Sequence, residues 1–219
     1  MKKYIALLIF SMTISTASVA QVEKYVLSGG EMIFSLADQN LDQENVLRWS
    51  PVFNAQSWHV FDFGVPALFY GLSIRNVGFI VEDSDTDIKK KYRTYNAGLP
   101  VGMILTFTES VGIYGGYEFE VPFHYKEKTF INGDKEDKIT SWFSDRTPNF
   151  TQSVFFGFQF SSGTNIKFKY YLDNFFNQDF ETEVDGVITR PFQEYEVNVF
   201  YVALTFNVLK GKSVIKRFE

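Results

Sequence analysis

Three features of the sequence predict an all-β fold, a single up-and-down antiparallel transmembrane β-barrel of eight strands. Apolar and polar residues alternate with period two through most of the chain, as they do in half-buried strands. The alternating segments reach the 9–11 residues or so that a tilted strand needs to cross a bilayer. Short and long connections follow one another in turn, as in barrels of the outer membrane.

The alternation divides the chain into eight strands, each with an aliphatic or aromatic face and a small, polar or charged face. Val111, Phe119 and Val121, for example, lie on the opposite face of their strand from Glu118 and Glu120. The expected strands span residues 25–36, 46–63, 68–81, 92–107, 111–123, 150–160, 165–176 and 195–208. A ten-stranded barrel is the alternative, but it needs a break at 54–57 that would leave two strands too short to span.

The connections predict the orientation of the barrel. Short turns near 65–66, 108–110 and 161–163 would lie in the periplasm, and long polar loops at 37–45, 82–91, 124–149 and 177–194 outside. Asn132-Gly133 in the longest loop is a typical tight hairpin turn, so we expect a two-stranded ribbon there. The outer loops are the expected place for a protein partner, since loops on a rigid scaffold often carry function.

The N-terminal end of the chain predicts export. Residues 1–20 have the basic start, apolar middle and small-residue end of a signal peptide, with cleavage between Ala20 and Gln21. The barrel is then expected at 21–209 and a short periplasmic tail at 210–219.

The composition excludes several kinds of partner and site. Removing Lys2 and Lys3 takes the net charge from −5 to −7, which argues against nucleic acid as a partner. The chain has no cysteine, which excludes disulfides, thiolate metal sites and a lipidated anchor.

The polar strand faces predict a charged lumen. Because a buried charge is costly unless it is paired, we expect an ion-pair network in which Arg48 and Arg75 meet carboxylates. Side chains just fill an eight-stranded barrel, so the expected result is a polar plug, with a narrow ion or water path as the alternative. The expected lumen residues are Glu31, Arg48, Asp62, Arg75, Glu118, Glu120, Lys167, Lys169, Asp173 and Glu196.

Aromatic residues near the strand ends predict anchors at the membrane interface, where rings gather at headgroup level. The expected anchors are Trp142, Phe143, Phe150, Phe175 and Phe176. The chain does not stop on an aromatic residue, so Phe206 or Tyr201 would supply the signal that the barrel-assembly machinery reads.

No catalytic, cofactor or metal site is predicted. Of the two histidines, His59 falls on the outward face of its strand, and His124 lies at an outer strand end within possible reach of Glu118, Glu120 or Ser144. Residues 82–87 resemble half of a calcium loop, but Ile88 replaces the required glycine and Lys89 to Lys91 would repel a cation. A solvated loop is therefore expected.

Four stretches resemble small outer-membrane β-barrel domain proteins, PorT-like or OmpA-like: LRWSP at 47–51, IRNVGFI at 74–80, YRTYNAGLPVGM at 92–103 and KFKYYLDNFFN at 167–177. The resemblance covers essentially the whole mature chain. It implies a non-enzymatic integral protein of the Gram-negative outer membrane with a structural, surface-interaction or assembly role. Its implied partners are outer-membrane lipid, lipopolysaccharide and the barrel-assembly machinery. The alternatives are a narrow-pore transport protein, a lipid-modifying enzyme and a soluble exported ligand-binding barrel.

Overall fold

The computed structural model describes residues 22–108, 111–160 and 162–207. The expected signal peptide, the cleavage site between Ala20 and Gln21, and the tail at 210–219 lie outside these residues. Within the described part of the chain, no helix is long and apolar enough to span a membrane.

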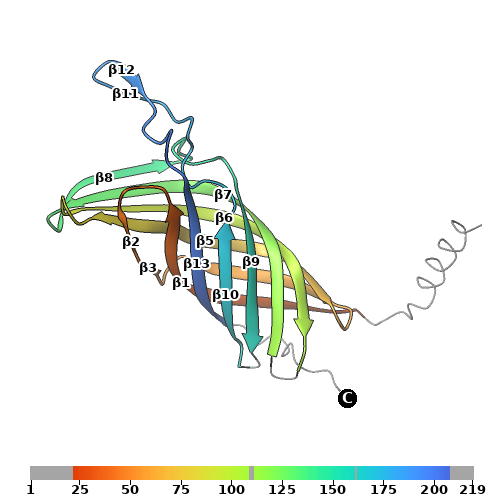
Figure 1. Ribbon diagram of the computed structural model, residues 1–219. Helices are drawn as coiled ribbons and strands as arrows, with labels where there is room; N and C mark the ends of the chain where they lie inside the picture. Colours follow the sequence, from red (N-terminus) through yellow and green to blue (C-terminus); the bar gives the residue numbers. More distant parts are fainter. Residues whose placement is uncertain (1–21, 109–110, 161, 208–219) are drawn as a thin grey trace, which may run out of the picture.

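Eight antiparallel strands form a closed ring (Figure 1). The last strand pairs with the first from Gly29 opposite Asn207 to Gln39 opposite Val197, so the sheet has no free edge there. The eight-stranded barrel expected from the sequence is therefore confirmed, and the ten-stranded alternative is wrong. The ring consists, in order, of β1 (Glu23–Gln39), β4 (Ala55–Asp62), β5 (Ala67–Asp83), β6 (Ile88–Thr106), β7 (Val111–Ile131), β9 (Thr151–Phe160), β10 (Thr164–Tyr171) and β13 (Val197–Asn207).

Five short strands complete the sheet structure. β8 (Asp134–Trp142) extends β7 as a ribbon, and Asn132 and Gly133 make its turn with φ values of 52° and 85°. β2 (Glu44–Val46) pairs with β5, and β3 (Arg48–Ser50) pairs with β1. β11 (Thr182–Val184) and β12 (Val187–Thr189) form a separate hairpin. The strand expected at 46–63 is thus interrupted between β3 and β4.

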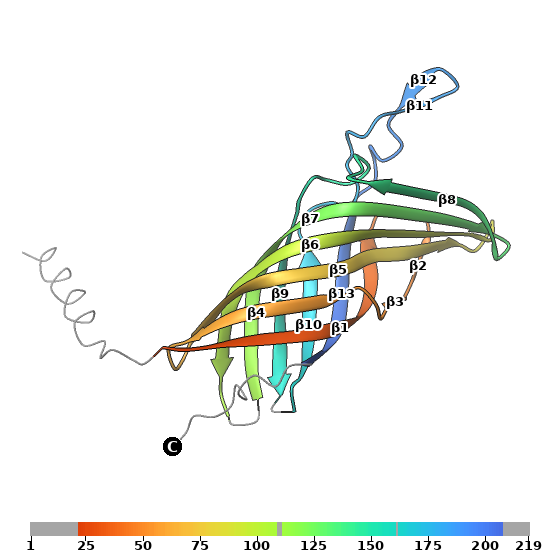
Figure 2. The ribbon, with the colours of Figure 1, turned by 180° about the vertical axis from the view of Figure 1, so that it is seen from behind.

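The short turns gather at one end of the barrel and the long loops at the other (Figure 2). β5, β6 and β7 contain 17, 19 and 21 residues, whereas β9 and β10 contain 10 and 8. Since about 9–11 residues suffice to cross a bilayer, β5, β6 and β7, with β8 beside them, continue well past β9 and β10 at the long-loop end. β1 also contains 17 residues.

Side chains alternate between the outside and the inside of the ring. On β5, the exposed residues Leu68, Leu72 and Ile74 alternate with buried Ser73 and Arg75. The apolar strand faces therefore point outward, and the small and charged faces point into the lumen.

Near the short turns, the lumen is filled by four aromatic rings that each cover a glycine on the neighbouring strand. A side chain at any of these glycines would collide with the ring and with backbone, so the missing Cβ is what lets the rings lie flat against the wall. The pairs are Trp58 with Gly71, Phe69 with Gly102, Tyr114 with Gly157 and Phe155 with Gly116.

At the long-loop end, the chain after β10 turns back into the barrel mouth. Phe175 and Phe176, expected at the membrane interface, are only 7% and 1% exposed and pack against Phe79, Tyr92 and Phe192. The interface assignment is therefore wrong for this pair. The strand ends at Tyr171, and the loop that follows buries both rings instead of continuing along the wall. Trp142, Phe143 and Phe150 are exposed, at 60% or more.

The glycine positions can be tested by adding one methyl group. We expect Gly116→Ala to lower the free energy of unfolding by about 1–3 kcal/mol, because its Cβ would overlap the Phe155 ring and the Val101 carbonyl. Gly112→Ala, on the same face of β7, is the matched control, since its nearest neighbour is the Leu105 carbonyl at 3.4 Å. Denaturant unfolding followed by tryptophan fluorescence measures both. Equal losses would contradict the ring-over-glycine packing.

Candidate functional site: the charge network inside the barrel

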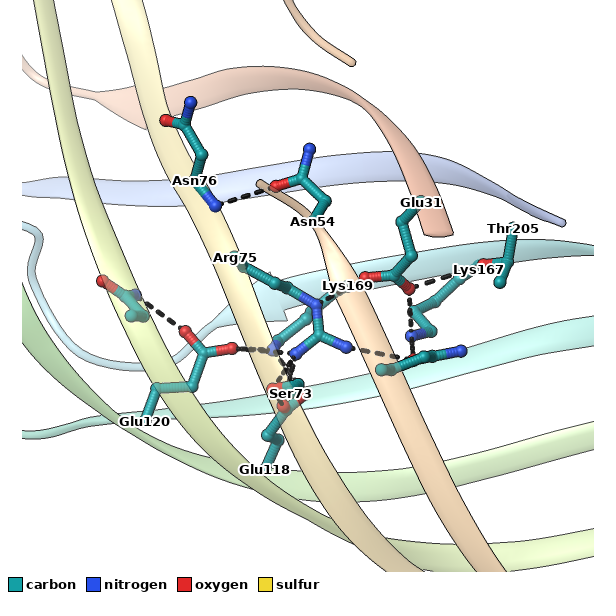
Figure 3. Close-up of polar contacts among 12 residues, drawn as sticks. Glu31, Asn54, Ser73, Arg75, Asn76, Glu118, Glu120, Lys167, Lys169 and Thr205 are labelled. Atoms are coloured by element: carbon teal, nitrogen blue, oxygen red, sulfur yellow. Dashed lines mark hydrogen bonds and ion pairs between the residues drawn. The ribbon is translucent and has the colours of Figure 1, made fainter. Parts of the chain in front are cut away.

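Six charged side chains meet in the middle of the lumen, between the two aromatic layers (Figure 3). Three are carboxylates and three are cations, so their formal charges cancel. Each of the six side chains is at most 1% exposed. They come from four strands: Glu31 on β1, Arg75 on β5, Glu118 and Glu120 on β7, and Lys167 and Lys169 on β10.

Arg75 contacts all three carboxylates. Its Nε donates to Glu31 Oε2 at 2.7 Å, and its Nη1 reaches Glu118 and, at 3.3 Å, Glu120. Its Nη2 donates to Gln56 Oε1 at 3.1 Å. A planar guanidinium presents several fixed donors and can therefore join carboxylates from different strands, which a single ammonium does less well.

The two lysines complete the pairing from the opposite wall. Lys167 Nζ lies 2.5 Å from Glu31 Oε1, and Lys169 Nζ lies 2.7 Å from Glu118 Oε2 and also contacts Glu120. Aromatic faces lie near both ammonium groups, with Lys167 Nζ 5.1 Å from the Trp58 ring centre and Lys169 Nζ 5.0 Å from that of Tyr171. The ammonium groups therefore have carboxylate and aromatic neighbours in place of water.

Neutral groups satisfy the remaining carboxylate oxygens. The Tyr171 hydroxyl and the Asn96 amide donate to Glu120 Oε2 at 2.6 and 2.7 Å. Ser73 Oγ bonds Glu118, and a Cβ at Gly98 would overlap Ser73 Oγ and the Glu118 carboxylate and would lie 3.0 Å from Glu120 Cγ. Small residues on β5 and β6 thus leave the space that the carboxylates of β7 occupy.

The network follows from the period-two pattern. Glu118 and Glu120 lie two residues apart on one strand, as do Lys167 and Lys169 on another, so each pair shares the inward face. The structure brings together six of the ten residues expected in the lumen: Glu31, Arg75, Glu118, Glu120, Lys167 and Lys169.

The other four expected lumen residues lie elsewhere. Asp62 accepts from the Gly64 amide in a short turn, and Asp173 accepts from the Gln152 amide at the rim. Glu196 is exposed in the long loop before β13. These three residues lie at or beyond the ends of their strands, away from the middle of the barrel. Their side chains therefore contact turns or solvent.

Arg48 is buried, but among residues 22–108, 111–160 and 162–207 no carboxylate forms an ion pair with it, so that expectation is wrong. Its guanidinium donates to the Asn76 carbonyl at 3.2 Å and to Asn76 Oδ1 at 2.5 Å. The break between β3 and β4 explains the difference, because it leaves part of β5 without a partner strand on the side away from β6.

We call this part of the wall the side-chain seam, formed by Ser35, Arg48, Ser50, Asn54 and Asn76. It lies between the pairing of β4 with β5, which ends at Ile74, and that of β2 with β5, which begins at Ile80. Asn54 Oδ1 accepts from the Asn76 amide at 2.8 Å, and Ser50 Oγ donates to the Asn76 carbonyl at 3.3 Å. Ser35 Oγ donates to the Gly78 carbonyl at 2.6 Å. Side chains here replace the backbone ladder.

The sequence analysis did not single out the two aromatic layers that enclose the network. Trp58, Phe69 and Phe155 lie on inward strand positions where small or polar residues were expected. These rings can be recognised as lumen residues because each lies opposite a glycine on the neighbouring strand. That relation is visible only once the strand pairing is known.

The histidines considered for catalysis point away from Glu118 and Glu120. His124 lies on the outward face between the rings of Tyr95 and Trp142, at centroid distances of 5.3 and 4.6 Å. Glu118 and Glu120 point inward, into the ion pairs. His59 also points outward and stacks on Tyr70.

The acidic turn at 82–87 uses its carboxylates locally. Asp83 accepts from the Asp85 amide at 3.0 Å and from the Thr86 hydroxyl at 2.7 Å. Hydrogen bonds from the Thr86 hydroxyl, and then from the backbone amides of Asp85 and Thr86, lower the pKa of Asp83. Among residues 22–108, 111–160 and 162–207, no group of three or more metal-binding side chains is found.

No protein-family model matches the chain, and neither does any curated protein. Among solved structures, the chain is similar to Ail, the attachment invasion locus protein of Yersinia pestis. The TM-score is 0.38 and the identity 14%, over 84% of this chain and 97% of that one. The same values hold for Ail in complex with the heparin analogue sucrose octasulfate. For Neisserial surface protein A (NspA), the TM-score is 0.37 and the identity 10%, over 84% and 96%.

The network predicts a large effect from loss of its arginine. Arg75→Met leaves three buried carboxylates with two cations, and we expect a loss of about 3–5 kcal/mol in the free energy of unfolding. Arg75→Lys should lose less, since it keeps the charge. Arg190→Met, which breaks a half-exposed pair with Glu181, is the control and should lower the stability far less, because solvent screens that pair. Urea unfolding measures all three, and similar losses for Arg75→Met and Arg190→Met would contradict the network's role.

Proposed function

We propose that the protein is a non-enzymatic integral barrel of the outer membrane, with a closed lumen and a structural or surface-interaction role. One observation carries the proposal: apolar side chains cover the outside of the ring, and its buried charges lie within. The membrane is the solvent that suits such an arrangement.

The outward surface supports insertion in lipid. Large apolar side chains are exposed on most strands of the ring, among them Leu72, Leu99, Phe119 and Phe156, each at 50% or more. Water-soluble monomers rarely expose contiguous apolar patches of this kind. A soluble ligand-binding barrel would have the opposite arrangement, with an apolar pocket inside.

Three layers of side chains support a closed lumen. Aromatic rings fill the barrel at the short-turn end, the ion-pair network fills its middle, and rings from the β10–β13 loop fill the mouth. A cavity of about 20 Å³ beside the network, lined by Thr94, Asn96 and Thr151 among others, is the size of a single water. This packing favours a plug over an ion path.

The last strand carries a feature that suits insertion by the barrel-assembly machinery. Phe206 is 47% exposed near the short-turn end of β13, whereas Tyr201 is fully buried. Of the two aromatic residues considered for the assembly signal, Phe206 is therefore the one that we propose.

The long-loop end supports a role at the cell surface. The β7–β8 ribbon and the β11–β12 hairpin both project from this end of the barrel (Figure 1). If the short turns face the periplasm, these elements lie outside the cell, where a protein partner has access to them.

Cell fractionation and gel mobility test the location. We expect the protein in the outer-membrane fraction, migrating differently before and after boiling, because a closed hydrogen-bonded barrel resists detergent until it is heated. A soluble periplasmic protein without a mobility shift would show that the inward and outward faces have been exchanged.

Planar-bilayer recording tests the closed lumen. We expect no steady conductance steps from the purified protein, while a wide porin recorded under the same conditions provides the positive control. Reproducible small steps would instead support the narrow-pore alternative.

A further inference from the structure

The outward face of β6, β7 and β8 carries a concentration of cations at the long-loop end. Lys91 on β6 lies directly opposite Lys128 on β7, which lies directly opposite Lys138 on β8. One row closer to the barrel, Arg93 lies opposite Lys126. We call these five residues the cation rows. Like charges in directly opposed positions destabilise a sheet, so the arrangement is unfavourable by itself.

Acidic side chains on these strands do not compensate the cation rows. Glu127 alternates with Lys126 and Lys128, so it points to the other face, where it accepts from the Tyr125 hydroxyl at 2.8 Å. Asp137 lies opposite Thr129, which also belongs to that other face. Within the described part of the chain, no ion pair joins a residue of the cation rows to a carboxylate, whereas the neighbouring Lys89 pairs with Glu82 at 2.9 Å.

Mutual repulsion between these cations disfavours the protonated form of the central lysine. Partial burial, and then the charges of Arg93, Lys135, Lys91 and Lys138, lower the pKa of Lys128. The pKa of Lys126 is also lowered, by partial burial and by the charges of Arg93 and the neighbouring lysines. An anion held among these side chains would remove the unfavourable interaction.

Directly below the cation rows lies a row of rings. Tyr95, His124 and Trp142 are cross-strand neighbours on β6, β7 and β8, with ring centres 5.3 and 4.6 Å apart. Phe53 packs edge-on against Tyr95 and is 68% exposed. Below the rings, the same face continues with Leu99, Val101 and other exposed aliphatic residues.

Along the strands, this face presents aliphatic residues, then rings, then cations. A bilayer has the corresponding order of hydrocarbon, interface and phosphate. Lys128 lies four residues past His124, about 13 Å along the strand, which is about 9 Å of height for a strand tilted by 45°. The cation rows therefore lie where headgroups begin, if the rings mark the interface.

We propose that the cation rows bind the phosphates of a phosphorylated glycolipid headgroup in the outer leaflet. The inference rests on the proposed membrane location and adds a ligand class and a site to it. Adjacent strands are about 4.8 Å apart, so the lysines of one row span about 10 Å and can surround one phosphate or bridge two. A protein partner is the less favoured occupant, because the rows adjoin the rings and aliphatic face that would lie in lipid.

The decisive experiment compares two triple variants in nanodiscs of phosphatidylcholine, with and without phosphorylated lipid A. The row variant is Lys91→Gln, Lys128→Gln and Lys138→Gln. The control variant, Lys24→Gln, Lys90→Gln and Arg190→Gln, removes the same charge at positions off this face. Boiled and unboiled gel mobility first establishes that each protein is inserted, so a failure of insertion would count against the proposed location and this inference together.

We expect the row variant to bind phosphorylated lipid A about 100-fold more weakly than wild type, since each cation near an anionic surface is worth about fivefold. The control variant should bind like wild type. Titration followed by native mass spectrometry gives the dissociation constants, and lipid A without phosphates should bind none of the three proteins tightly.

Stability gives an independent readout, because the difference in stability between the row variant and wild type should change sign when lipid A is added. Without lipid A, the row variant should unfold at a higher urea concentration than wild type, because three opposed charges are gone. With lipid A the order should reverse, because a ligand stabilises the state that binds it.

Three results would overturn the proposal: unchanged lipid A binding by the row variant, equal binding of phosphate-free lipid A, or binding of a soluble sulfated oligosaccharide but not of the lipid. The last result would assign the face to a soluble polyanion.

Discussion

The pairing of β13 with β1 is the interaction on which the rest of the structure depends. It turns a sheet with two open edges into a ring, so that the first and last strands, like the central ones, have a partner strand on both sides. In hydrocarbon an unpaired amide or carbonyl costs several kcal/mol, so closure is what permits an apolar outer surface. Closure also defines an interior in which the side chains of the network are buried. Every charge on the inward face must then find its partner among the other inward residues, and the equal number of carboxylates and cations in the network meets this condition.

The lumen shows how a narrow barrel combines two kinds of packing. Aromatic rings need glycines opposite them, and the charged layer needs serines and glycines beside its carboxylates. Large and small residues therefore alternate around the ring at each level. The cations also touch the aromatic layers, through Lys167 above Trp58 and Lys169 beside Tyr171, so the layers support each other.

Strand number, faces and most of the charge network could be predicted because they depend on period two alone. Glu118 and Glu120 must share a face wherever their strand lies, and so must Lys167 and Lys169. What the sequence could not predict depends on where the chain leaves the sheet. Phe175 and Phe176 continue an apolar pattern, but the chain turns inward after Tyr171 and buries them. Arg48 lies on the expected face, yet the break after β3 gives it a backbone carbonyl and an amide as acceptors. The cation rows could not be predicted from the sequence pattern either, because only the cross-strand register brings Lys91, Lys128 and Lys138 together.

The side-chain seam has a consequence for which sequences the barrel can tolerate. A backbone ladder forms with almost any side chains, so most wall positions can vary as long as the outward residue is apolar. At the seam each bond depends on one particular amide, hydroxyl or guanidinium, from Asn54, Ser50, Ser35 or Arg48. Polar residues at these positions are required by the barrel's integrity, without any ligand or partner being involved. The seam is also a part of the wall that amino-acid replacement can loosen without unpairing a strand, which makes it a natural starting point for an opening through the wall to evolve.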